Sequence, residues 1–320
     1  MRHIFIINPA AGKLNPLALL TPPIRAAAER EGCNYEIYTT TGPGDAFNFV
    51  QGRLDSHCGP VRFYACGGDG TLNEVACALA GHTRASLGII PCGSGNDFIK
   101  ILGKDRNFFD IAGQLEGEEQ DSDIIRVNDR YSINLCSIGL DADVGANMAR
   151  FKKWPLITGA TAYNLSLAYC LCRPMGHRLR ISFDGEEPIE HKLLLMVAAN
   201  GSFYGGQYRC APKAQIDDGL MDVCLVDHLS RLRIPPLISA YKEGRHVDDP
   251  RFSKLITYRK CRRLTVWADR PVSICIDGEM LTGDRFDFEL LPRAIRLSLP
   301  KSSPGAFERR MEELCSGTAR

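Results

Sequence analysis

The stretch Gly67-Gly68-Asp69-Gly70-Thr71-Leu72-Asn73-Glu74 indicates how the first part of this chain folds. It follows a strand-like run at residues 61–66 and precedes an apolar, helix-forming run at residues 75–80. Three glycines in four positions let the backbone turn sharply and come close to a ligand. A loop between a strand and a helix N-terminus presents backbone N–H groups that favour phosphate. The stretch therefore predicts a phosphate-binding site rather than a plain turn.

Two further turns of this kind follow predicted strands. Asn8-Pro9-Ala10-Ala11-Gly12-Lys13 comes after a strand at residues 4–7, and Gly93-Ser94-Gly95-Asn96-Asp97-Phe98 comes after a strand at residues 87–91. The alternation of strands and helices indicates a parallel α/β sheet, in which ligands bind outside the carboxyl ends of the strands. Each loop alone is weak evidence, because a glycine turn is usually only a turn. Three loops at one sheet edge favour a nucleotide.

Neither of the two commonest nucleotide fingerprints fits these loops. A dinucleotide-binding fold needs a glycine where Asn73 stands. A Walker A loop needs Ser or Thr after its lysine, but Leu14 follows Lys13. The sequence therefore predicts a different way of binding phosphate.

The character of the chain changes after about residue 123. Many short strands follow, with turn signals at Asn128-Asp129 and Asp184-Gly185. This pattern predicts an antiparallel β-sandwich or barrel-like domain, with helical insertions near residues 155–172 and 235–243. In the first part, Pro22-Pro23 is expected to interrupt or restart a helix at residues 17–31.

Composition narrows the class of protein. The chain has 320 residues, 44% hydrophobic residues and a net charge of +1, which gives no reason to expect nucleic-acid binding. Its 13 cysteines show neither a C-x-x-C spacing nor a small disulfide framework, so free thiols in a reducing cytosol are expected. Without a signal-peptide pattern or an apolar run near 20 residues, the expected location is cytoplasmic or peripheral to a membrane.

The three loops together resemble the nucleotide-site motifs of the diacylglycerol kinase catalytic family, and the soluble bacterial lipid kinases are the most similar in length and layout. Sphingosine and ceramide kinases share that catalytic core, and NAD kinases share the fold. The resemblance implies an ATP-binding α/β domain at residues 1–123 and about 300–320, and a β-rich lipid-substrate domain at residues 124–299. The role of the tail at residues 304–320 is left open.

The resemblance also implies which residues meet ATP. They are the backbone and side chains of the three loops, together with a threonine before the second predicted helix: Asn8, Pro9, Ala10, Ala11, Gly12, Thr40, Gly67, Gly68, Asp69, Gly70, Thr71, Leu72, Asn73, Glu74, Ser94 and Asn96. Thr71, Asn73 and Ser94 are expected to add side-chain hydrogen bonds.

Two magnesium sites are implied by the same resemblance. Asp69, Asp97 and Asp123 would surround a catalytic Mg²⁺ through water, with a solvated acid at the domain junction as the alternative for Asp123, since lone acids are mostly surface residues. A structural Mg²⁺ would lie in residues 211–220, held by the Asp218 carboxylate and the carbonyls of Gln215 and Leu220. From the residues alone, Asp217-Asp218-Gly219 is a common turn sequence.

A late Asp277-Gly278-Glu279 follows a predicted strand and resembles the family's catalytic motif. The resemblance implies that Asp277 is the general base, which accepts the proton of the acceptor hydroxyl, and that Glu279 assists it. Taken alone, Asp-Gly predicts a hairpin turn, and the two interpretations are compatible.

The resulting hypothesis is an ATP- and Mg²⁺-dependent lipid kinase acting on diacylglycerol or a similar lipid alcohol at or from a membrane surface. Two alternatives stay open: a kinase for a sphingoid base, phosphatidylglycerol or NAD, and a non-catalytic nucleotide-binding regulator. Basic and aromatic residues at 151–155 suit a membrane interface or a helix packed on the sheet. The sequence does not fix the oligomeric state, and a homodimer is compatible with it.

Overall fold

A computed structural model describes residues 1–56, 58–103, 105–151, 159–173 and 175–301. The chain forms two compact units, Met1–Ile124 with the chain from Pro292, and Ile125–Leu291. The chain passes from the first unit to the second after Ile124, one residue from the expected boundary. It re-enters the first unit at Pro292, earlier than the expected position near residue 300. The chain re-enters early because one long strand, at residues 279–299, contains this boundary. Leu297 of that strand already pairs with Leu87 of the first unit.

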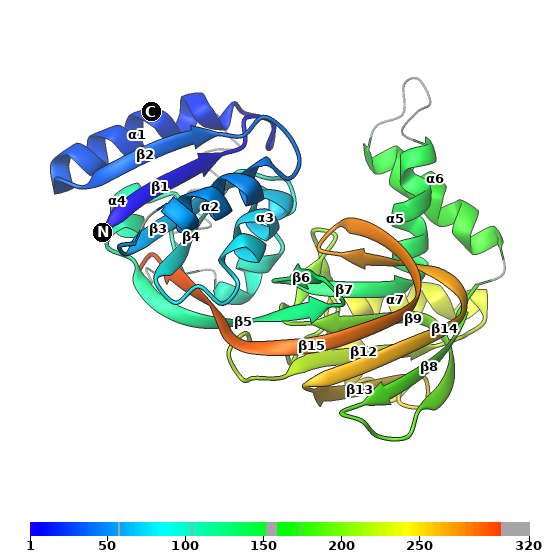
Figure 1. Ribbon diagram of the computed structural model, residues 1–320. Coiled ribbons are helices and arrows are strands. Elements are labelled where there is room, and N and C mark those ends of the chain that lie inside the picture. Colours follow the sequence, from blue (N-terminus) through cyan, green and yellow to red (C-terminus); the bar gives the residue numbers. More distant parts are fainter. Residues whose placement is uncertain (57, 104, 152–158, 174, 302–320) are drawn as a thin grey trace. The chain divides into compact units, whose positions relative to one another are not determined.

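The first unit is built on a parallel sheet with the strand order β15-β4-β3-β1-β2 (Figure 1). Its strands are β1 (Arg2–Ile7), β2 (Asn34–Thr39), β3 (Val61–Gly67), β4 (Ala85–Pro91) and the last residues of β15 (Glu279–Leu299). Every residue of β3 and β4 is buried, as expected for strands covered on both faces. The predicted parallel α/β architecture of this unit is confirmed.

Helices cover both faces of this sheet (Figure 1). They are α1 (Pro16–Glu31), α2 (Asp45–Ser56), α3 (Asp69–Leu79) and α4 (Ile111–Leu115), with a 3₁₀ turn η1 (Phe98–Leu102) after the third glycine loop. Residues of α1 and α4 share one hydrophobic core with alternate residues of β1 and β3, whereas α3 packs on β3 and β4. The carboxyl ends of β1, β3 and β4 lead directly into the three glycine loops.

The prediction that Pro22-Pro23 interrupts or restarts the first helix is wrong, because α1 runs continuously from Pro16 to Glu31. Proline inside a helix removes a backbone hydrogen bond and costs about 3 kcal/mol. Burial of Leu20 and Ile24, on either side of the two prolines, offsets that cost. Asn15 caps the helix by accepting from the N–H groups of Leu17 and Ala18.

The second unit is an antiparallel β-structure in which two long strands bend and are shared between two layers. Its strands are the end of β5 (Glu118–Val127), which begins in the first unit, β6 (Arg130–Ser132), β7 (Leu135–Gly139), β8 (His177–Phe183), β9 (Ile189–Ala199), β12 (Met221–Asp227), β13 (Ile256–Cys261), β14 (Arg263–Ile276) and most of β15. Both β7 and β8 pair with β9 and with β14, which closes a ring of strands. The predicted sandwich or barrel-like domain is confirmed.

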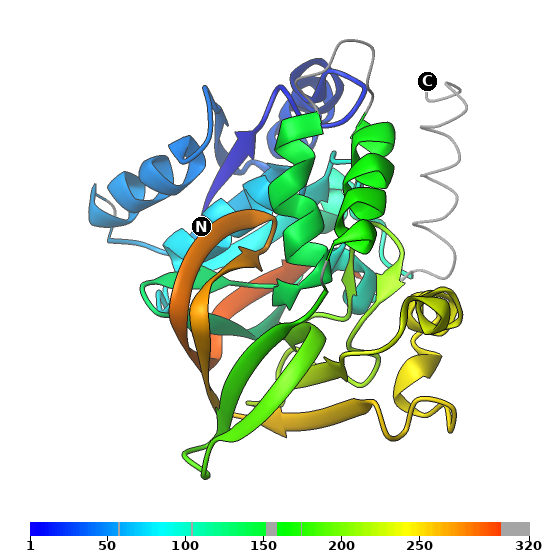
Figure 2. The same cartoon turned by 90° about the vertical axis from the view of Figure 1, so that its right-hand side faces the viewer.

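Two hydrophobic cores lie on opposite sides of the β9 and β12 layer. One fills the ring of strands, and the other lies beneath helices and loops. The remaining elements of this unit are α5 (Leu140–Phe151), α6 (Gly159–Cys172), α7 (Ile234–Lys242), the 3₁₀ turns η2 (Arg231–Arg233) and η3 (Arg245–Val247), and a ribbon of β10 (Phe203–Tyr204) and β11 (Tyr208–Arg209). Figure 2 shows α5 and α6 side by side.

Some elements differ from the sequence-based expectation. Where many short strands are predicted, β14 and β15 are long, at 14 and 21 residues, and β14 contains a register shift between Trp267 and Val272. Helix α5 was not expected, because two acids and a glycine weaken its helical pattern. The basic and aromatic residues at 152–155 and the tail at 304–320 lie outside the described residues.

Two bulk features of the described residues bear on the expected class. The cysteines in this part of the chain are free thiols. Within the same residues, none of the helices combines the length and the apolar character that a membrane crossing requires.

Candidate nucleotide and acceptor sites

The three glycine loops of the first unit touch one another. The amide of Asn8 donates a hydrogen bond to the hydroxyl of Thr71 (3.0 Å), which ties the first loop to the second. The carbonyl of Gly67 accepts from the backbone N–H groups of Cys92 (2.7 Å) and Gly93 (3.2 Å), which ties the second loop to the third. The loops predicted separately from the sequence therefore form one continuous rim at the ends of β1, β3 and β4.

Glycine is required where these loops approach most closely. A Cβ atom on Gly93 would lie 2.4 Å from the Cα of Gly68, and a Cβ atom on Gly12 would lie 2.2 Å from the carbonyl oxygen of Cys92. Neither neighbour can move without shifting the backbone, since both contacts are with main-chain atoms. The loops therefore meet through bare backbone, and main-chain N–H groups in glycine loops of this kind are donors from which phosphate oxygens accept.

The second loop passes into α3 without a side-chain cap. Gly68 is the N-cap residue, and it makes no side-chain cap bond to this helix. A Cβ atom on Gly70 would meet no atom within 4 Å, so the space beside the first turn is open. Helix N-termini of this kind favour an anion. Ser94, in the third loop, is exposed and Thr40 is buried.

Glu74 has a structural partner that the sequence did not indicate. Its two carboxylate oxygens accept from the N–H groups of Gly44 (2.8 Å) and Ala46 (3.1 Å), at the start of α2. The side chain thus fastens α2 to α3. Its expected place among the nucleotide-binding residues stays a prediction.

Asp69 and Asp97 come together around Gly95. A Cβ atom on Gly95 would lie 2.7 Å from Oδ2 of Asp69 and 3.5 Å from Oδ2 of Asp97. The backbone N–H of Asp97 donates to Oδ1 of Asp69 (2.6 Å), and Lys100 forms an ion pair with Asp97. Burial and the nearby charge of Asp97 raise the pKa of Asp69. Lys100 pairs with Oδ1 of Asp97, whereas the Oδ2 atoms of Asp69 and Asp97 are the ones that lie near Gly95. These two Oδ2 atoms are the carboxylate ligands that would suit Mg²⁺.

Asp123 is fully buried, and its Oδ1 accepts from the backbone N–H of Arg293 (2.8 Å). Arg293 has a positive φ of 52°, so this contact holds the turn at which β15 enters the first unit. Asp123 belongs to no group of three or more acidic, histidine or cysteine side chains able to hold a metal among the described residues. Of the three predicted magnesium-organising acids, the structure brings Asp69 and Asp97 together.

In the second unit, Asp277 and Gly278 form the two-residue turn between β14 and β15. Their φ values are 45° and 94°, and Ile276 pairs with Glu279 across the turn. Two positive φ values are the requirement of a type I′ hairpin, which Asp-Gly satisfies. The predicted hairpin is confirmed, and Glu279 is exposed beside it.

The carboxylate of Asp277 accepts hydrogen bonds from one hydroxyl and three consecutive backbone N–H groups. The donors are Ser132 Oγ (2.8 Å), Ile133 N (2.8 Å), Asn134 N (3.3 Å) and Leu135 N (2.8 Å). These bonds favour the charged form, but burial outweighs them and raises the pKa of Asp277 to about 6. A carboxyl group with this pKa can both hold and release a proton near neutral pH.

A second buried carboxyl group of this unit was missed by the sequence reasoning. Asp141 lies in the first turn of α5, and burial raises its pKa to about 6. Its Oδ2 is buried without a hydrogen-bond partner. Its sequence context, Gly139-Leu140-Asp141, carries no motif that would have singled it out.

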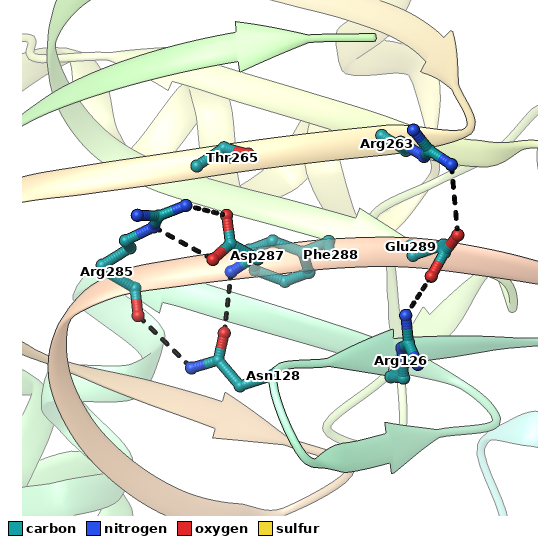
Figure 3. A pocket seen from close by; sticks show the side chains of 8 residues that line it. All are labelled: Arg126, Asn128, Arg263, Thr265, Arg285, Asp287, Phe288 and Glu289. Atoms are coloured by element: carbon teal, nitrogen blue, oxygen red, sulfur yellow. Dashed lines mark hydrogen bonds and ion pairs between the residues drawn. The ribbon is translucent and has the colours of Figure 1, made fainter. Parts of the chain in front are cut away.

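The Arg126–Glu289 surface is a charged hollow on β5, β14 and β15, lined by Arg126, Asn128, Arg263, Thr265, Arg285, Asp287, Phe288 and Glu289 (Figure 3). Its arginines face carboxylates of the same hollow: Arg285 lies 3.0 Å from Asp287, and both Arg126 and Arg263 pair with Glu289. Each arginine is already paired with a carboxylate, and Arg126 and Arg263 share Glu289, so most of the positive charge of this surface is offset within the hollow.

Two family models together cover almost the whole chain. The diacylglycerol kinase catalytic domain matches residues 2–127, and the YegS C-terminal NAD kinase beta sandwich-like domain matches residues 134–299. The first match contains the three glycine loops, and the second contains Asp277 and Glu279.

Individual proteins match over the same length. A probable YegS-like lipid kinase of Chromohalobacter salexigens is 31% identical over 91% of this chain and 93% of its own length. A diacylglycerol kinase of Staphylococcus saprophyticus is 29% identical over 87% of this chain and 88% of its own. The crystal structure of a diacylglycerol kinase from Bacillus anthracis shares the fold, with a TM-score of 0.67 at 22% identity over 95% of this chain and 98% of that one.

Proposed function

Because the chain belongs to the YegS-like and diacylglycerol kinase family of lipid kinases, we propose that it transfers the γ-phosphate of ATP to a hydroxyl of diacylglycerol or a similar lipid alcohol. The product from diacylglycerol would be phosphatidate. The observation that carries the proposal is the continuous rim of three glycine loops, which contact one another through main-chain atoms at the carboxyl ends of β1, β3 and β4.

In this proposal the first unit binds the donor. Backbone N–H groups of the rim and of the first turn of α3 hold the phosphates, and Ser94 offers an exposed hydroxyl beside them. Asp69 and Asp97 would hold Mg²⁺ through water, and the ion would neutralise charge on the transferred phosphoryl group. Phosphoryl transfer depends mainly on positioning and charge, so these acids need not attack the substrate.

Asp277, in the second unit, is the proposed general base. To accept the lipid hydroxyl proton, its carboxylate must give up one of its four hydrogen bonds. The hydroxyl of Ser132 can rotate away, whereas the backbone N–H groups of residues 133–135 are fixed by their turn. The exposed Glu279, across the hairpin turn, is proposed to orient the acceptor.

The direct test is a labelling experiment on the full chain. Purified protein is incubated with Mg²⁺ and γ-labelled ATP in the presence of vesicles containing diacylglycerol, sphingosine or phosphatidylglycerol, or with NAD in solution. Label in phosphatidate is expected. Label in another acceptor would keep the kinase assignment and correct the substrate.

A matched variant separates catalysis from nucleotide binding. Asp277→Ala should abolish labelling while ATP still binds, because the glycine rim belongs to the other unit. If the wild-type protein binds ATP but labels none of the acceptors, the kinase proposal fails and a nucleotide-binding regulator is favoured instead.

A further inference from the structure

The segment expected to hold a structural Mg²⁺ has a different partner in this chain. Of the expected metal ligands, Gln215 is exposed, and Asp218 is the one expected to bind through its side chain. Oδ1 of Asp218 accepts from the backbone N–H of Leu220 (3.0 Å), which closes the turn. Oδ2 of Asp218 accepts from the ammonium group of Lys260 (2.6 Å). Both carboxylate oxygens are therefore engaged by donors from the chain itself.

Lys260 reaches this position from the neighbouring strand. It lies on β13, directly opposite Asp222 of β12 in the antiparallel pair. Its ammonium nitrogen is 3.0 Å from Oδ2 of Asp222, so that one cation bridges two carboxylates. The strand register fixes this bridge, since Lys260 could not face Asp222 after a one-residue slip.

Asp222 needs a positive partner. Its side chain is fully buried, and the Tyr258 hydroxyl donates to its Oδ1 (2.7 Å). A buried carboxylate without a cation is strongly unfavourable. The ammonium group of Lys260, 3.0 Å from Oδ2 of Asp222, supplies that cation.

A divalent cation does not fit beside this ammonium group. Mg²⁺ and Ca²⁺ bind carboxylate oxygen at about 2.0–2.6 Å, which would bring the ion against Lys260 on the same Asp218 oxygen. Like charges at that separation repel strongly. No cluster of three or more acidic, histidine or cysteine ligands surrounds Asp218 within the described part of the chain.

We propose that the Lys260 ammonium group takes the place of a structural divalent cation, so that the second unit is held together at Asp218 and Asp222 by a cation built into the chain. The inference does not depend on the proposed kinase activity, because it concerns folding of this unit. It implies that any magnesium requirement of the protein belongs to the nucleotide and not to this segment.

The test compares thermal unfolding of the full chain in excess EDTA, in Mg²⁺ and in Ca²⁺, without nucleotide. For the wild-type protein the midpoint is expected to be the same in all three, within about 1 °C. Lys260→Met removes the charge while keeping most of the side-chain volume. It should lower the midpoint in EDTA by about 5–10 °C, because a buried ion pair loses one partner. Added Mg²⁺ or Ca²⁺ should recover part of that loss.

Lys213→Met is the matched control, since Lys213 pairs with Asp248 on the exposed surface and should have little effect. A wild-type midpoint that falls in EDTA and is restored by Mg²⁺ would overturn the proposal. If Lys260→Met does not fold, the wild-type comparison still decides. Calorimetric titration of the wild-type protein with Mg²⁺ gives a second measure, in which binding that Asp218→Asn abolishes would also overturn it.

Discussion

The amide nitrogen of Asn8 lies 3.0 Å from the hydroxyl of Thr71, and this hydrogen bond joins two glycine loops across 63 positions of sequence. The Oδ1 atom of the same Asn8 side chain accepts from the backbone N–H of Ala10 (3.0 Å), which shapes the first loop. Asn8 therefore fixes the distance between these two loops, and in the proposed function this would affect ATP binding in addition to any direct contact with ATP.

We expect Thr71→Val to weaken ATP binding about fivefold, since the volume is kept while one hydrogen bond of about 1 kcal/mol is lost. Asn8→Ala should have a similar effect, and the double variant should be little worse than either single one. Calorimetric titration with MgATP measures all four proteins. Additive losses would contradict the coupling, because independent ATP contacts add. Thr282→Val, at an exposed position of the second unit, is the control.

The close approach of Gly68 and Gly93 gives a steric prediction. In Gly93→Ala, the new Cβ atom would lie 2.4 Å from the Cα of Gly68, so the second and third loops must separate. ATP binding should fall by at least about 100-fold, whereas a backbone shift confined to loops should leave most of the fold intact. Gly52→Ala is the matched control, because its Cβ meets no atom within 4 Å and alanine favours the helix α2.

The parts of the site that depend on local backbone chemistry could be predicted from the sequence. Asp277 and Gly278 predict a hairpin because the two-residue turn needs positive φ at both positions, and this requirement involves no other part of the chain. The glycine loops are local in the same sense. The parallel sheet also follows from the order and spacing of strands and helices.

Contacts set by strand register or by distant segments could not be predicted. The four donors to Asp277 belong to residues 132–135, which are more than 140 positions earlier. The bridge from Lys260 to Asp222 depends on which residues of β12 and β13 face each other. Glu74 looks like part of the nucleotide motif in the sequence, but only the packing of α2 against α3 reveals its bonds to Gly44 and Ala46.

The raised pKa of Asp277 predicts an acidic limb in the activity profile. If Asp277 is the base, it must be deprotonated, so kcat/KM should rise with pH through about 6 and level off above it. Asp277→Asn should remove most of the activity and the limb with it. The measurement is initial rate of lipid phosphorylation from pH 5 to pH 8, with circular dichroism to show that the variant is folded.

Asp141 provides the control for this profile, because burial raises its pKa to about 6 as well. Asp141→Asn should keep the limb near pH 6. If the limb disappears in Asp141→Asn and persists in the residual activity of Asp277→Asn, the base has been assigned to the wrong carboxyl group.

Two buried histidines predict that the protein loses stability in mild acid. Burial lowers the pKa values of His3 and His246 to about 4, from 6.5 for an exposed histidine. The unfolded chain therefore binds more protons below pH 6.5, so stability is fully present above that pH and falls as the pH drops towards 4. Each histidine accounts for a loss of about 3 kcal/mol over this range.

Urea unfolding at pH 7, 5.5 and 4.5, followed in each unit by a local probe, measures this loss. In His3→Gln the first unit should lose less stability on acidification than in the wild type, because glutamine does not titrate and can still hydrogen-bond the Tyr64 hydroxyl, which lies 2.8 Å from His3 Nδ1. In the same variant, the dependence of the second unit's free energy of unfolding on pH (its slope) should be unchanged. His82→Gln, at an exposed position, should leave both slopes as they are. An unchanged slope for the first unit in His3→Gln would show that other groups cause its acid sensitivity.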